Sequence, residues 1–140
     1  MSSPYFLDTN ILIYATSLAS DHVAKRPIAR SWVARTDWGL STQVLMEFYA
    51  NARQPRHGLL PTAPQAFVES LAARRPVQAV DRELVLAALS LRNRYNLSHW
   101  DAAILCAAAR LGAHTVISED LSQGQQYDGV TVLNPFVAQA

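Results

Sequence analysis

The chain lacks the residues that would link it to an oxidising compartment or to a membrane. It has 140 residues and a single cysteine, Cys106, so no internal disulfide can form, and this favours a reducing compartment. Cys106 lies in an apolar run, which favours a buried, unreactive thiol over a nucleophile. No apolar run approaches the roughly 20 residues of a membrane span, and no signal peptide is visible. The sequence therefore predicts a cytoplasmic protein that does not enter a membrane.

Bulk charge is nearly absent as well. The net charge is +1, and the basic side consists of eleven arginines and one lysine, Lys25. A protein with so little net charge is not attracted to polyanions as a whole. If it binds a nucleic acid, it must do so through local patches or through bound metal ions.

The apolar content is sufficient for one sizeable core. Half of the residues are hydrophobic, and there is no repeat, low-complexity tract or long linker, so residues 1–140 are expected to form a single domain. Strands are expected at 5–7, 38–41, 77–80, 114–117 and 130–133, and helices at 11–15, 22–36, 42–53, 64–75, 82–95 and 98–111. We expect Thr42, Asp81 and Ser98 to cap three of these helices. Short strands alternating with helices predict a three-layer α/β/α sandwich around a short, mainly parallel central sheet.

Acidic residues follow two of the expected strands, at the edge where open parallel sheets bind ligands. Asp8 comes directly after the first strand, and Glu119 and Asp120 come just after the fourth. Glu47 and Asp101 lie on helices that are expected to begin at the same edge. Several carboxylates at one edge repel one another unless a cation lies between them. Oxygen ligands without His or Cys favour Mg²⁺ or Mn²⁺ over zinc.

Each acidic residue also has a purely local explanation. Asp8 could cap the helix that follows it, and Asp101 lies three residues after Ser98, as in a capping box. Glu47 could be a solvated surface residue, and 119–120 could form a polar turn after a strand. The combination of residue type, order and position carries more weight than any one of these motifs.

The set resembles the PIN-domain nucleases, and in particular the small VapC-type toxins of prokaryotic toxin–antitoxin pairs. The matching segments span nearly the whole chain and lie at 6–10, 41–48, 97–104, 118–121 and 124–136. The resemblance implies a PIN-like fold, a metal-dependent endoribonuclease that hydrolyses RNA phosphodiester bonds, a cognate antitoxin as partner and a homodimer. The implied cofactor is Mg²⁺ or Mn²⁺.

The resemblance also implies roles for individual residues. Catalytic and metal-binding roles fall on four carboxylates: Asp8, Glu47, Asp101 and Asp120. Asp120 is preferred over its neighbour by the family pattern alone. Supporting roles fall on Asn10 and Ser118, which would orient a carboxylate, water or phosphate, and on Glu119 as an auxiliary acid. Local turn or strand-end hydrogen bonding is the alternative for Asn10 and Ser118.

A basic loop and three tryptophans are the remaining candidates for RNA contact. Arg53, Arg56 and His57 could contact phosphates, although solvated surface charge explains them equally well. The tryptophans could stack on bases, but their apolar neighbours favour core or interface positions: Trp32, Trp38 and Trp100. His99, beside Asp101, is expected to be partly buried or at the surface rather than in contact with RNA.

Two other readings place aspartates at strand ends. A receiver domain needs a late lysine, whereas the only lysine here is early, and a haloacid-dehalogenase-like phosphatase has a second aspartate where this chain has Asn10. The non-enzymatic alternative is a catalytically silent PIN-fold module that binds RNA or a protein. Intact carboxylates argue against this alternative without excluding it.

Overall fold

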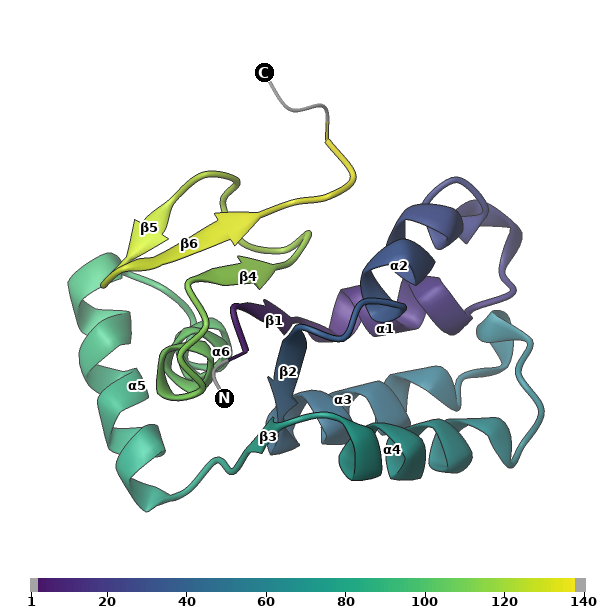
Figure 1. Ribbon diagram of the computed structural model, residues 1–140, viewed down its shortest axis with the longest axis horizontal. Helices are drawn as coiled ribbons and strands as arrows, with labels where there is room; N and C mark the ends of the chain where they lie inside the picture. Colours follow the sequence, from purple (N-terminus) through teal and green to yellow (C-terminus); the bar gives the residue numbers. More distant parts are fainter. Residues whose placement is uncertain (1–2, 138–140) are drawn as a thin grey trace.

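The computed structural model, which describes residues 3–137, contains a six-stranded sheet in the order β3-β2-β1-β4-β6-β5 (Figure 1). The strands are β1 (Tyr5–Leu7), β2 (Trp38–Ser41), β3 (Val77–Gln78), β4 (Thr115–Ile117), β5 (Gln126–Tyr127) and β6 (Val130–Leu133). All neighbouring pairs are parallel except β5 and β6, which are antiparallel. The prediction of a short, mainly parallel central sheet is confirmed.

Helices cover both faces of this sheet. They are α1 (Thr9–Thr16), α2 (Arg26–Val33), α3 (Thr42–Ala52), α4 (Ala63–Arg74), α5 (Arg82–Tyr95) and α6 (His99–Arg110), with short 3₁₀ turns η1 (Ser20–His22) and η2 (Pro55–His57). In Figure 1, α5 and α6 lie on one side of the sheet and α1 to α4 on the other, which makes the expected three layers. None of the helices in residues 3–137 has the length and apolar character needed to cross a membrane.

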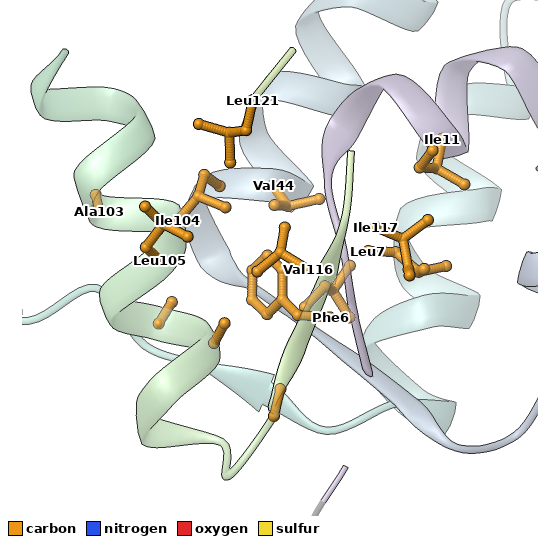
Figure 2. Packing of buried hydrophobic residues seen from close by; sticks show 14 of the residues in the cluster. Phe6, Leu7, Ile11, Val44, Ala103, Ile104, Leu105, Val116, Ile117 and Leu121 are labelled. Atoms are coloured by element: carbon orange, nitrogen blue, oxygen red, sulfur yellow. The ribbon is translucent and has the colours of Figure 1, made fainter. Parts of the chain in front are cut away.

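The central strands are buried on both faces. Phe6 and Leu7 are successive residues of β1, so their side chains point to opposite faces, and both are fully buried. Figure 2 shows Phe6 on the side of Leu105 from α6, while Leu7 lies near Ile11 from α1. Burial of a side chain of this size stabilises the fold by about 1.5–3 kcal/mol. The helices on both faces therefore hold the short strands in place.

Two expectations about the elements were wrong, and one strand was missed. The helix expected at 22–36 is a 3₁₀ turn followed by a shorter helix that begins at Arg26, because Pro27 lacks an N–H and fits only the first turn of a helix. Ser41 rather than Thr42 caps α3, by accepting a hydrogen bond from the Val44 N–H. Strand β5 was not expected. Asp81 and Ser98 cap α5 and α6 as predicted.

Candidate active site

The pairing of β1 with β4 places Asp8 beside Ser118. Leu7 is level with Ile117 in this parallel pair, so the residues that follow the two strands leave the sheet together. The Asp8 N–H donates to the Ile117 carbonyl at 3.0 Å. The Ser118 hydroxyl donates to Asp8 Oδ2, and the Thr9 N–H donates to Oδ1, both at 2.7 Å. Asp8 is thus the N-cap of α1, and each of its two carboxylate oxygens accepts a hydrogen bond.

Asp8 lies in surroundings that oppose its negative charge. Its side chain is buried, and this burial raises the pKa of the carboxyl from 3.8 to about 6. The hydrogen bonds from Ser118 and Thr9 lower the pKa, whereas the charges of Asp120 and Glu47 raise it further. Capping and charge clustering are therefore not competing explanations, because the same carboxylate takes part in both.

Asn10 and Ser118 connect Asp8 to the segment that follows β4. Asn10 donates through Nδ2 to Asp120 Oδ2 at 3.1 Å and accepts through Oδ1 from the Glu119 N–H at 3.2 Å. The Ser118 hydroxyl oxygen accepts from the Asp120 N–H at 3.1 Å. Asp120 is exposed, but these bonds hold its backbone and one of its carboxylate oxygens. The polar residues two positions from Asp8 and Asp120 thus link the two acids.

Glu47 and Asp101 approach the same edge from two helices. Thr9 Oγ1 donates to Glu47 Oε1 at 3.5 Å, which links α3 to the start of α1. Asp101 lies in the first turn of α6, where its N–H donates to the Ser98 hydroxyl at 3.1 Å. Burial is the largest effect on both carboxyls and raises the pKa of each, and the charge of Asp120 raises both further. The structure thus brings all four predicted acids into one electrostatic group.

The donor set of this group suits a hydrated divalent ion. Within residues 3–137, no three His, Cys, Asp or Glu side chains converge closely enough to ligate one ion together. Mg²⁺ is usually held by one or two carboxylates and keeps several of its waters, so it does not need such convergence. None of the four acids forms an ion pair with a basic side chain in the described part of the chain. Burial is the main cause that raises the pKa values of Asp8, Glu47 and Asp101, and neighbouring acidic charges raise them further.

Glu119 belongs to a different arrangement. Its carboxylate forms an ion pair with Lys25 and accepts a hydrogen bond from the Tyr14 hydroxyl. Burial alone would raise the pKa of Glu119, but the hydrogen bonds from Lys25 and Tyr14 outweigh it and the pKa is lowered. The Lys25 ammonium also lies 4.7 Å from the ring centre of Tyr14 and 5.4 Å from that of Phe136. Sequence reasoning missed Lys25 and Tyr14, because no local pattern joins residues so far apart in the chain.

The basic loop at 53–57 is only partly available for RNA. His57 is 1% exposed and both of its ring nitrogens are hydrogen-bonded, so its interpretation as a phosphate contact was wrong. Arg53 is exposed and lies over the ring of Tyr49, 5.2 Å from its centre. Arg56 is exposed and lines a cleft of about 500 Å³ that also includes Glu47 and Asp120.

The tryptophans differ from one another. Trp38 is buried in the core and Trp32 is half-buried against Tyr5, as the apolar neighbours predicted. Trp100 is 67% exposed and is therefore not a core residue. His99 is half-buried, as expected, and its Nε2 atom is buried without a hydrogen-bond partner in the described residues.

Several solved structures share the fold of this chain at low sequence identity. VapC20 of Mycobacterium tuberculosis, described as a sarcin–ricin loop cleaving toxin, is 20% identical with a TM-score of 0.66, over 83% of this chain and 91% of that one. A toxin–antitoxin complex from Klebsiella pneumoniae is 21% identical with a TM-score of 0.66, over 94% and 97%. DNA-bound VapBC from Salmonella typhimurium is 21% identical with a TM-score of 0.62, over 91% and 95%.

These pairwise identities are low, so the assignment of a family depends on the comparison with family models. No curated protein sequence matches the chain. The PIN domain family matches residues 5–127, which include strands β1 to β5 and all four clustered acids. The chain therefore belongs to the PIN domain family.

Proposed function

We propose that residues 1–140 form a single nuclease domain that acts as a metal-dependent endoribonuclease, the toxin of a toxin–antitoxin pair. The observation that carries this proposal is the gathering of Asp8, Glu47, Asp101 and Asp120 from four separate segments, with no paired cation in the described residues. A protein loses stability by placing such charges together, so the arrangement makes sense as a binding site for a cation that the chain itself does not supply.

The proposed ion is Mg²⁺ or Mn²⁺, held by these four carboxylates directly or through water. When bound, such an ion lowers the pKa of a water and neutralises charge on a phosphodiester. Ser118 would keep Asp8 Oδ2 in place, and Asn10 would hold Asp120 Oδ2 in its position. Thr9 would restrain Glu47 in the same way.

The proposed partners are RNA as substrate, a cognate antitoxin and a second copy of the chain. One of the similar solved structures is described as a toxin–antitoxin complex, which supports the proposal of an antitoxin partner. The exposed apolar side chains Met46 and Trp100, which are 73% and 67% exposed, flank Glu47 and Asp101 in the sequence and are suited to a protein contact. We also propose a cytoplasmic location, because a single cysteine, which cannot form an internal disulfide, favours a reducing compartment.

A cleavage assay tests the activity. Purified protein with Mg²⁺ or Mn²⁺ should cleave total RNA, and EDTA should abolish the cleavage. Asp8→Asn and Asp101→Asn should each lower the rate by more than about 100-fold, beyond the usual cost of losing an outer-shell partner. Asp37→Asn is the matched control, because Asp37 is paired with Arg35 outside the acidic group.

The alternative, a silent module that binds RNA or protein, predicts a different result. Under that alternative the wild type does not cleave RNA with either ion, and Asp8→Asn leaves RNA binding unchanged. Undiminished cleavage by Asp8→Asn and Asp101→Asn would show that the proposed site is wrong.

A further inference from the structure

The cleft beside the four acids has a second end with a different chemistry. Its volume of about 500 Å³ is that of a small-molecule site, and Glu47 and Asp120 line one end. Three residues line the other end: Asn51 near the end of α3, Gln54 at the N-cap of η2, and Arg56 within η2. A phosphodiester held at the acidic end would bring the neighbouring nucleotide within reach of these three residues.

A buried histidine determines how Asn51 is oriented. The His57 Nε2 atom lies 2.9 Å from Asn51 Oδ1, and Arg56 Nη2 donates to the same oxygen at 3.4 Å. Because an amide oxygen only accepts, His57 Nε2 must carry a proton. Burial, and next the charge of Arg56, lower the pKa of His57, so its ring is neutral and its Nδ1 accepts from the Ser17 hydroxyl at 2.9 Å.

The remaining polar atoms of this end are almost all donors. Asn51 Oδ1 is occupied, so its Nδ2 group is left to donate, and no described residue accepts from it. Gln54 Oε1 accepts from Arg56 Nε at 2.8 Å, which leaves Gln54 Nε2 as a donor without a described partner. The guanidinium of Arg56 has further N–H groups. The far end of the cleft therefore presents donor groups from three side chains, at positions 51, 54 and 56.

We propose that this end of the cleft is a subsite for the nucleotide next to the scissile phosphate, and that it selects a keto purine, guanine, over adenine. Guanine presents two acceptors, O6 and N7, on one edge, whereas adenine places an amino donor where guanine has O6. Donor side chains can form hydrogen bonds to both guanine acceptors. The adenine amino group is itself a donor, so it cannot accept from them. The inference rests on the proposed function, because the acids must hold the scissile phosphate for the subsite to be used.

Nucleotide binding in the absence of metal tests the subsite independently of RNA cleavage. GMP, IMP and AMP are titrated into the full chain in EDTA, and the imidazole signals of His22 and His57, which line the cleft, are followed by NMR. IMP differs from AMP in its 6-keto group, which replaces the 6-amino group, and in the N1 proton that accompanies it; the O6 and N7 edge is otherwise the same. GMP and IMP should bind about tenfold more tightly than AMP, the lower part of the range for one bidentate base contact.

Gln54→Glu tests the role of the Gln54 Nε2 donor, because it removes this N–H group. Glutamate keeps an acceptor for Arg56 Nε but has no side-chain N–H to donate. Its added negative charge should weaken the binding of all three nucleotides to the same extent. The variant should therefore lower the preference for GMP over AMP by at least threefold, while Gln125→Glu, an exposed control outside the cleft, should retain the preference. Equal binding of GMP and AMP by the wild type, or an unchanged preference in Gln54→Glu, would overturn the subsite.

The two proposals fail in different ways. If GMP binds selectively but RNA is not cleaved with either ion, the nuclease proposal fails and the nucleotide cleft is retained. If RNA is cleaved but the histidine signals do not respond to GMP, the subsite fails and the nuclease proposal is retained.

Discussion

Asp8 and Glu119 are both carboxylates at the same edge of the central sheet, yet their surroundings differ. Asp8 is buried among other acids, and its pKa is raised to about 6. Glu119 is paired with Lys25 and Tyr14, and its pKa is lowered. One acid has a cation within the chain, and the other lacks one. The comparison separates a carboxylate that is paired within the fold from one that has no cationic partner in the described residues.

The largest expected effect of this difference is on the pH dependence of stability. The folded pKa of Asp8 is raised, so the stability that this group contributes is complete below pH 3.8 and is lost as the pH rises to about 6. The loss amounts to about 3 kcal/mol at pH 7.5, since one pKa unit corresponds to 1.36 kcal/mol. Asp8→Asn does not titrate and should be more stable than the wild type by up to that amount in urea unfolding without metal.

The same experiment at pH 4 is the internal control. The two proteins should be nearly equally stable there, because Asp8 is protonated in the folded state. A difference that is the same at pH 4 and pH 7.5 would mean that hydrogen bonding to Ser118 and Thr9, and not charge, separates the two proteins.

A slightly smaller effect is expected from the ion itself. Mg²⁺ or Mn²⁺ at about 100 times its dissociation constant should raise the free energy of unfolding by about 2.7 kcal/mol, if the ion binds only the folded chain. The increase should be smaller in Asp8→Asn and unchanged in Asp37→Asn. Equal stabilisation of all three proteins would place the ion elsewhere.

The smallest effect is expected at Glu119 and has the opposite sign to that at Asp8. Glu119→Gln should destabilise the folded state by about 1 kcal/mol at pH 7.5, the usual size for a partly exposed charged hydrogen bond. Because the folded pKa of Glu119 is lowered, this stability is present above pH 4.5 and is lost as the pH falls through the folded value. Thermal unfolding across this range measures the change.

Lys25→Met supplies the partner for a double-mutant cycle. If Lys25 acts through Glu119, the double variant should be about as stable as the worse single variant. Additive losses would show that Lys25 stabilises the fold mainly through the rings of Tyr14 and Phe136.

The sequence was informative wherever the signal was local. The apolar runs that became β1, β2, β4 and β6 were recognisable, as was the order of the acids that follow them. Strand β5 was also accessible: Asp128 and Gly129 have φ values of 50° and 88°, as in a type I′ hairpin turn, and Asp-Gly is a typical sequence for this turn. The segment before this turn, Gln126–Tyr127, has only two residues in the strand and lacks the apolar run that marked the other strands.

The interactions that could not be predicted join distant segments. Nothing near His57 in the sequence indicates that its ring is buried against Ser17. The pairing of Lys25 with Glu119 likewise depends on the packing of the segment between α1 and α2 against the end of β4. Sequence reasoning therefore located the acids but could not assign each one its partner.

Lys25 has one more consequence, which concerns chemical labelling. It is the only lysine in the chain, so its ammonium is the only side-chain amine that an acylating reagent can modify. The hydrogen bond to Glu119 is the main cause that raises the pKa of Lys25, and a protonated amine is a poor nucleophile. The rate of acylation at Lys25, followed by mass spectrometry of the peptide that contains it, therefore reports how strongly Glu119 keeps this amine protonated.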